Sequence, residues 1–110
     1  MCIRDRSLDE ANANGLLSRG LIYYSQKQYT KAIPDLEKYF TNNLGTAENW
    51  FILGLCHRNS GDAKSAIPAY TQAIQIKPSD KRYYNSRAKA YQAIGMNAEA
   101  NRDLEMVKRL

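Results

Sequence analysis

Apolar and aromatic side chains recur along this chain at spacings of three, four and seven residues, which is typical of amphipathic helices. The stretches that carry this pattern come in pairs, and short polar turns separate the two members of each pair. The sequence therefore predicts an all-α chain built of helical hairpins. The first helices of the pairs are expected at residues 16–25, 50–59 and 83–93, and the second helices at residues 32–40, 66–76 and 98–110.

An offset of 34 residues links chemically similar side chains along nearly the whole chain, without an insertion or a gap. The small residues that it relates are Gly20, Gly54 and Ala88 in the first helices, and Ala32, Ala66 and Ala100 in the second helices. The large residues that it relates are Tyr23, His57 and Tyr91, and Leu36, Tyr70 and Leu104. Such a period indicates a repeat array, in which each hairpin packs on its neighbours. The small residues are expected where the two helices of a hairpin cross closely, with the large residues filling the space around them.

The prolines are expected to mark helix boundaries. Pro78 follows the fourth predicted helix and cannot continue it. Pro34 and Pro68 are expected in the first turns of helices that begin near Thr30 and Lys64, where a missing N–H would have had no partner in any case.

Composition places the chain among soluble globular proteins, with 44% hydrophobic and 25% charged residues. The net charge of +5 favours an acidic partner only mildly, because the basic residues are spread along the chain and form no run. The longest uncharged apolar stretch, from Trp50 to Cys56, is far too short to span a bilayer, so this segment is expected to make no membrane contact.

No residue pattern indicates catalysis, a metal or another cofactor. Cys56 and His57 are neighbours in a predicted helix and point about 100° apart, so they cannot form a thiol–imidazole pair. The carboxylates, Asp35 and Asp103 among them, are scattered over turns and helix faces and are expected to be solvated. We therefore expect a chain that is not an enzyme and needs no cofactor.

The first six residues differ from the rest of the chain. Residues 1–6, Met-Cys-Ile-Arg-Asp-Arg, match no part of the repeat and resemble the translation of a sequencing-library adapter. The natural sequence is then expected to begin near Ser7, with its true start missing. Residues 7–12 are expected to lead into the first helix, since Ser7 and Glu10 have the spacing of a capping box.

The second repeat resembles the tetratricopeptide repeat, whose pattern is Trp, Leu-Gly, Tyr, Gly, Ala, Phe, Ala and Pro. Its residues at these positions are Trp50, Leu53, Gly54, His57, Gly61, Ala66, Tyr70, Ala73 and Pro78. The third repeat has Arg87 where Leu is usual, and the first has Lys27 for Gly and Leu44 for Pro. The resemblance divides the chain into residues 13–46, 47–80 and 81–110, the last repeat being incomplete.

The resemblance implies a right-handed α-solenoid of three stacked helix-turn-helix repeats, whose first helices line a concave groove. Members of this family bind peptides or partner helices in the groove. We therefore expect a protein-interaction module from a larger scaffold or assembly protein; the alternative is a non-catalytic segment of a larger enzyme or secretion-related protein. RNA binding is not expected, because the period and the signature residues are those of the protein-binding repeats.

Family geometry selects the residues that are expected to face the groove. Those expected to contact a ligand are Leu17, Leu21, Tyr24, Phe51, Leu55, Arg58, Arg82, Asn85 and Lys89, and Asn14, Glu48 and Gln92 complete the face. This face runs from apolar to basic, which favours a peptide with apolar anchors and acidic residues. The alternative is that a missing upstream repeat, or the segment around Ser7, covers Leu17, Leu21 and Phe51.

One subclass of the family holds the terminal carboxylate of heat-shock chaperones with Lys, Asn and Arg side chains. The matching residues in this chain are Leu17, Leu21, Ile52, Arg82 and Ser86. Only Arg82 fits, so this clamp is not expected here.

The far end of the array is expected to be open. No polar capping helix follows Leu110, so Leu104, Met106 and Val107 are expected to be partly uncovered. Two alternatives follow from this expectation: either the natural protein continues, or two copies associate through this end.

Overall fold

The computed structural model describes residues 15–110, and every regular element in this range is an α-helix. A helix over residues 15–25 comes first. The helices that follow are α2 (Tyr29–Asn42), α3 (Ala47–Asn59), α4 (Ala63–Ile76), α5 (Lys81–Ala93) and α6 (Asn97–Arg109). This confirms the all-α prediction. The expectations for residues 1–6, residues 7–12, the capping box and Asn14 lie outside the described residues.

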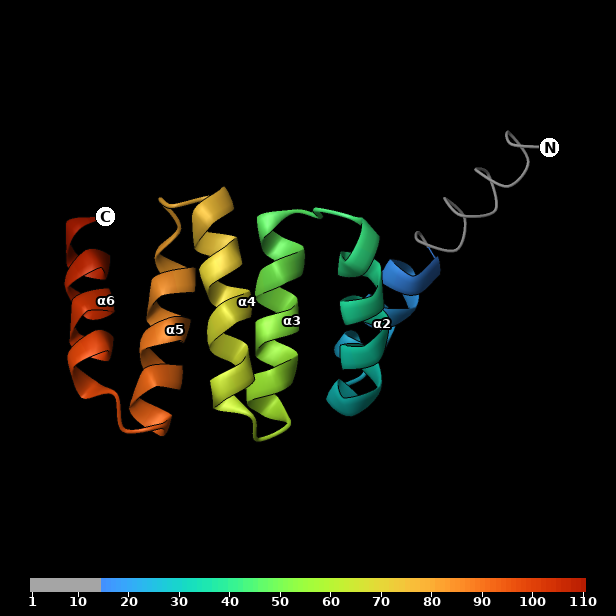
Figure 1. The fold of residues 1–110 in the computed structure, drawn as a ribbon, viewed down its shortest axis with the longest axis horizontal. Helices are drawn as coiled ribbons and strands as arrows, with labels where there is room; N and C mark the ends of the chain where they lie inside the picture. The colour runs from blue at the N-terminus through green and yellow to red at the C-terminus, as the bar shows by residue number, and fades with distance from the viewer. Residues whose placement is uncertain (1–14) are drawn as a thin grey trace. The chain divides into compact units, whose positions relative to one another are not determined.

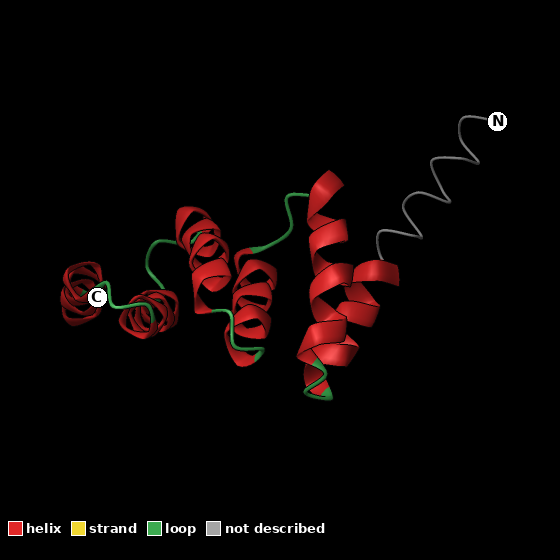
Figure 2. Ribbon diagram, turned by 60° about the horizontal axis from the view of Figure 1, so that its bottom comes forward, coloured by secondary structure: helices red, strands yellow, loops and turns green. Residues whose placement is uncertain are grey.

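The chain divides into two compact units, the first ending at Leu44 and the second comprising Gly45–Leu110. In the second unit α3 packs against α4, α4 against α5, and α5 against α6. Figures 1 and 2 show these four helices side by side in chain order. The buried cluster that holds them together consists of Ala47, Phe51, Ala66, Tyr70, Ala73, Ile74, Tyr83, Tyr84 and Ala90.

The close helix crossings are confirmed at two glycines. A Cβ atom on Gly54 would lie 2.6 Å from Cδ1 of Tyr70 and closer still to its Cε1. A Cβ atom on Gly20 would lie 2.9 Å from Cδ2 of Leu36. Because real Cβ atoms do not approach other atoms so closely, only glycine permits these crossings with the present neighbours.

Local signals in the sequence explain where α3, α4 and α5 begin. The side chain of Thr46 accepts a hydrogen bond from the Asn49 amide at the start of α3. Asp62 and Asp80 cap α4 and α5 in the same manner. Each side chain satisfies an amide that has no partner within its helix.

The turns between paired helices contain one residue with positive φ in each hairpin. Gly61 and Gly95 have φ of 92° and 81°, as expected for glycine. Lys27 has φ of 61° at the corresponding turn of the first hairpin. A side chain is disfavoured in this left-handed region, so the first turn is strained where the other two are not.

The expected placement of two prolines is wrong. Helices α2 and α4 begin at Tyr29 and Ala63, which places Pro34 and Pro68 in their second turns. Each proline therefore removes a regular helical hydrogen bond, to the carbonyl of Thr30 or Lys64. Both of these residues are exposed, so water can reach the carbonyls that lack an amide donor.

The expectation that Asp35 and Asp103 are solvated is also wrong. These residues are only 6% and 3% exposed. The Asp35 carboxylate accepts hydrogen bonds from Nε and Nη2 of Arg19, both at 2.7 Å. The Asp103 carboxylate accepts the same two bonds from Arg87, at 2.8 and 2.7 Å. Burial is tolerated because a planar guanidinium meets each carboxylate with two parallel hydrogen bonds.

At the far end, Leu104, Met106 and Val107 are half-buried, and the last two pack against the buried cluster of the second unit. Partial cover was expected for these side chains. Three apolar side chains near them in the sequence are more exposed: Ile94, Met96 and Leu110. None of the helices within residues 15–110 has the length and apolarity needed to cross a membrane.

Candidate functional site

The predicted ligand-facing residues of the second unit lie on α3 and α5 at helical spacing. They are Glu48, Phe51, Leu55 and Arg58 on α3, and Arg82, Asn85, Lys89 and Gln92 on α5. Contacts near the beginnings of the two helices bring these faces together. The ring centroids of Phe51 and Tyr83 are 4.9 Å apart, and Arg82 bonds to Glu48.

Arg82 is held by two carboxylates of its own chain. Its Nη1 and Nη2 donate to the two oxygens of Glu48 at 3.2 and 2.8 Å. Its Nε and Nη2 donate to Asp80 at 3.1 and 2.8 Å. The bonds to Asp80 and then Glu48 raise the pKa of Arg82 above its ordinary value, so the guanidinium stays charged and occupied. A free Arg82, as the sequence suggested, is not what the structure contains.

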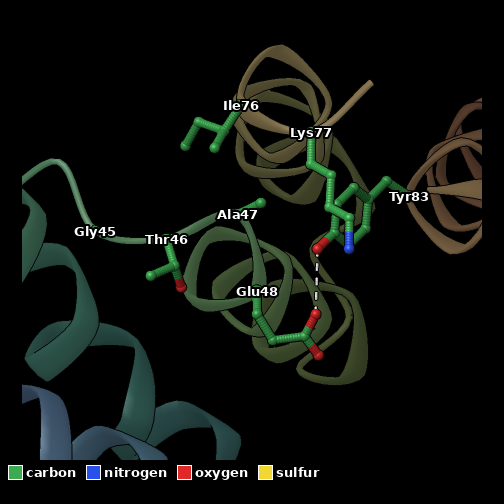
Figure 3. A pocket seen from close by; sticks show the side chains of 7 residues that line it. All are labelled: Gly45, Thr46, Ala47, Glu48, Ile76, Lys77 and Tyr83. Atoms are coloured by element: carbon green, nitrogen blue, oxygen red, sulfur yellow. Dashed lines mark hydrogen bonds between the residues drawn. The ribbon is translucent and has the colours of Figure 1, made fainter. Parts of the chain in front are cut away.

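Tyr83, which is buried, also contacts Glu48. Its hydroxyl donates to Oε2 of Glu48 at 3.1 Å, a bond drawn in Figure 3. Burial, followed by the bond to Glu48, raises the pKa of Tyr83 to about 12. Tyr83 therefore stays neutral at physiological pH and acts as a fixed donor that orients Glu48.

Phe51 is buried and does not present the open apolar surface expected for a ligand anchor. Only 8% of it is exposed, because the Tyr83 and Tyr70 rings pack on it with centroids 4.9 and 5.7 Å away. The guanidinium of Arg82 lies 5.4 Å from its ring centroid. Side chains of the second unit therefore cover Phe51. The alternative considered from the sequence was cover by a missing upstream repeat or by the segment around Ser7.

The remaining polar residues of this face are open to solvent. Arg58, Asn85, Lys89 and Gln92 are exposed, and Leu55 is half-buried beside the core cluster. The ion pairs within residues 15–110 involve neither Arg58 nor Lys89. On this predicted face, Arg58 and Lys89 can therefore contact a ligand without breaking an ion pair within residues 15–110.

The predicted residues of the first unit lie together on the helix over residues 15–25. Leu17, Leu21 and Tyr24 follow one another at spacings of four and three residues and are half-buried. The Tyr24 ring also meets that of Tyr29 edge to face, with centroids 6.1 Å apart. They share one helix face, as the spacing predicts.

A hollow of about 500 Å³ opens between the beginning of α3, the end of α4 and Tyr83 of α5. Its lining is labelled in Figure 3: Gly45, Thr46, Ala47, Glu48, Ile76, Lys77 and Tyr83. Both of its charged groups have partners, since Glu48 pairs with Arg82 and Lys77 lies 3.9 Å from Asp80. The hollow therefore holds no unpaired charge for a ligand.

The chemistry of the thiol and of the acidic groups agrees with a structural role. Cys56 is fully buried, and burial raises the pKa of its thiol to about 11. It is therefore a neutral thiol at physiological pH, and a thiol is a poor nucleophile. No three His, Cys, Asp or Glu side chains of the described chain come together in a way that could hold a metal ion.

The sequence analysis missed the cluster around Arg82, although a signal for it was present. Glu48 and Arg82 occupy the same repeat position in consecutive repeats and have opposite charges. Stacked repeats bring equivalent positions of neighbouring first helices close together. A comparison of charges at an offset of 34 would have predicted the pair.

Sequence comparison assigns the family. The profile of the tetratricopeptide repeat matches residues 17–81. The chain belongs to the tetratricopeptide repeat family. Tetratricopeptide repeats are protein-interaction modules, and the packing of α3 to α6 in successive pairs is that of this family.

Relatives of this tetratricopeptide repeat chain include the peroxisomal targeting signal receptor of Saccharomyces cerevisiae. The two are 33% identical over 84 residues, which cover 76% of this chain but only 14% of the receptor. A solved structure of MamA (AMB-1) is similar with a TM-score of 0.84 and 27% identity, over 96% of this chain and 59% of MamA. The second TPR of Spaghetti (RPAP3), bound to an HSP90 peptide, has a TM-score of 0.79 at 21% identity, over 96% of this chain and 98% of that one.

Proposed function

We propose that this chain binds an acidic peptide or partner helix along the exposed faces of α3 and α5. The ligand lies beside Leu55 and places carboxylates against Arg58 and Lys89. The observation that carries this proposal is that Arg58 and Lys89 are exposed and form no ion pair with another residue of the described range 15–110, on the first helices of two consecutive tetratricopeptide repeats.

The internal partners of the other charges support this choice of residues. Glu48 and Asp80 already occupy Arg82, so a ligand that used Arg82 would have to replace at least one of them. Arg58 and Lys89 can bind a carboxylate without that exchange. We therefore expect the acidic residues of the ligand to contact the later turns of α3 and α5. The cluster of Arg82, Glu48 and Asp80 near the beginnings of these helices is expected to take little part in binding.

The expected affinity is modest. Exposed ion pairs contribute roughly 0 to 1 kcal/mol each, and Leu55 offers only part of one side chain. Charge complementarity should chiefly set the orientation of the peptide and its association rate. Higher affinity would require further contacts.

Selection from an unbiased peptide library, followed by affinity measurement at low and high salt, tests the proposal. Recovered peptides should be enriched in Asp and Glu. The double change Arg58→Glu with Lys89→Glu should weaken their binding by about tenfold at low salt, because two attractive contacts become repulsive.

A matched control is the double change Lys64→Glu with Arg102→Glu, which alters the net charge equally on α4 and α6. Both residues are exposed and belong to second helices. Binding should fall far less in this variant. Equal losses in the two variants, or selected peptides with no acidic preference, would contradict the proposal.

A further inference from the structure

The site proposed on α3 and α5 offers charge but little apolar surface, because Leu55 is half-buried. The hollow between the beginning of α3 and the end of α4 offers what that site lacks. Ile76, at the end of α4, lines this hollow with a large aliphatic side chain that is 49% exposed. All 7 lining residues belong to the second unit, so the hollow is formed within that unit.

Other parts of the lining are apolar as well. Ala47 and Tyr83 are 7% and 1% exposed, and the aliphatic stem of Lys77 lines the same hollow (Figure 3). Ligand pockets in proteins commonly have volumes of roughly 300 to 1,000 Å³. The hollow, at about 500 Å³, can therefore receive a ligand side chain, and such a side chain would remove aliphatic surface of Ile76 from water.

The charges around the hollow balance one another. Glu48 and Asp80 are paired with Arg82, and Lys77 lies within reach of Asp80. A charged ligand residue would have to replace one member of these pairs, whereas an uncharged residue leaves them intact. The later turns of α3 and α5, by contrast, carry the two cations of the proposed site. Charge complementarity thus favours a ligand that is uncharged at the hollow and acidic at the later turns.

The spacing between the hollow and these cations suits a short peptide segment. Glu48 lines the hollow and also belongs to the predicted ligand-facing side of α3. Arg58 follows Glu48 on α3 at a distance of about 15 Å along the helix axis, and Lys89 follows Arg82 on α5 at about 10 Å. Because an extended peptide rises about 3.3 Å per residue, roughly three to five ligand residues span these distances.

We infer that the hollow receives one large apolar side chain, Leu, Ile, Met or Phe, of the same acidic peptide that contacts Arg58 and Lys89. This apolar anchor lies roughly three to five residues from the acidic residues of the peptide. It covers Ile76 and leaves the paired charges beside the hollow intact. The inference rests on the proposed function, and it adds the contact that determines which acidic peptides bind.

The probes are peptides from the unbiased library whose binding the double change Arg58→Glu with Lys89→Glu weakens by about tenfold. These peptides depend on the proposed site. They should carry a Leu, Ile, Met or Phe at the expected spacing from Asp or Glu. Selection against the Ile76→Ser chain should yield peptides that keep the acidic preference and lose the apolar one.

A double-mutant cycle measures the contact between the anchor and Ile76. Replacing the anchor by Ala should weaken binding to the unmodified chain by about tenfold, and Ile76→Ser should weaken binding of the original peptide by about fivefold. In the Ile76→Ser chain the anchor replacement should weaken binding only about twofold more, because the contact is already lost.

Ile94→Ser is the matched control for Ile76→Ser. Ile94 is 38% exposed and does not line the hollow. Both peptides should bind this variant as they bind the unmodified chain. Intermolecular nuclear Overhauser effects on the unmodified chain add a readout that no substitution disturbs, and the anchor should reach the methyl groups of Ile76.

Several results would overturn the inference while the proposed function stands. These are acid-dependent peptides without an apolar anchor, an anchor whose loss weakens binding equally in the unmodified and Ile76→Ser chains, and an anchor that reaches Ile94 in place of Ile76. Ile76 resonances that shift with protein concentration in the absence of peptide would assign the hollow to a second copy and would also overturn it. If the double change at Arg58 and Lys89 weakens no peptide, the proposed function falls and this inference falls with it.

Discussion

The second and third hairpins, α3 with α4 and α5 with α6, cross in the same register but fill the crossing with different chemistry. The second hairpin has Leu53 at a position where it is 4% exposed, with Ala69, also buried, at the opposing repeat position. The third hairpin has Arg87 and Asp103 at the same two positions, joined by two short hydrogen bonds. An apolar pair and a buried ion pair thus serve the same crossing.

The two solutions differ in what they specify. A Leu–Ala contact is non-directional, whereas a guanidinium–carboxylate pair fixes distance and orientation. Arg87 also donates to Thr71 of the preceding repeat, so one side chain connects both helices of its hairpin to α4. A buried ion pair need not be more stable than an apolar pair, because removing the charges from water costs free energy. We therefore expect the polar crossing to contribute to register more than to stability.

The largest expected effect comes from breaking the ion pair on one side. Arg87→Leu leaves the Asp103 carboxylate buried without its donor and should lower the free energy of unfolding by about 3 kcal/mol at neutral pH. Adding Asp103→Ala recreates the Leu53–Ala69 pair and should restore stability to within about 1 kcal/mol of the unmodified chain. Urea denaturation followed by circular dichroism measures both changes. A double variant as unstable as Arg87→Leu would show that the two crossings are not interchangeable.

Gly54→Leu should have an effect of similar size, a loss of about 2 to 4 kcal/mol. A side chain at this position meets the Tyr70 ring, which is fully buried and cannot move freely. The same denaturation measurement applies. Gly15→Leu is the matched control, since nothing lies within 4 Å of a Cβ atom at that residue. Equal losses at the two glycines would refute the crossing argument.

Lys27→Gly compares the turn of the first hairpin with those of the other two. The substitution relieves a left-handed backbone that Gly61 and Gly95 adopt without strain. The net gain should be about 0.5 to 1 kcal/mol, because the added flexibility of glycine in the unfolded chain offsets part of it. The melting temperature should rise. Lys31→Gly, within α2, should lower it instead.

Glu48→Gln provides the smallest expected change and contrasts an exposed ion pair with the buried one. Glu48 and Arg82 have side chains that are 49% and 54% exposed, so loss of the charge should alter stability by less than about 0.5 kcal/mol. A loss of stability as large as that of Arg87→Leu would mean that the exposed Glu48–Arg82 pair and the buried Arg87–Asp103 pair contribute equally, against the prediction from their exposure.

The hairpins, the 34-residue register and the close crossing at Gly54 could be predicted from the sequence because they depend on local periodicity and residue size. The buried aspartates could not be predicted by considering each charge alone, since a single Asp in a helix is usually solvated. The signal was coordinated substitution: Arg19, Leu53 and Arg87 change in step with Asp35, Ala69 and Asp103 at the 34-residue offset.

The candidate site was harder to predict than the fold. Repeat positions selected Leu55, Arg58 and Lys89 on α3 and α5, but they could not show that Phe51 is covered. That cover depends on Tyr83 and Arg82, which belong to the next repeat and pack through contacts between helices. Periodicity within one helix contains no information about such contacts.

The most direct test of the proposed function is to map the bound peptide on the full chain. Intermolecular nuclear Overhauser effects from a library-selected acidic peptide should reach Leu55 and the side chains of Arg58 and Lys89, with smaller changes at Arg82. Contacts confined to the second helices α4 and α6, or a peptide that leaves Arg58 and Lys89 unperturbed at saturation, would contradict a binding surface on α3 and α5.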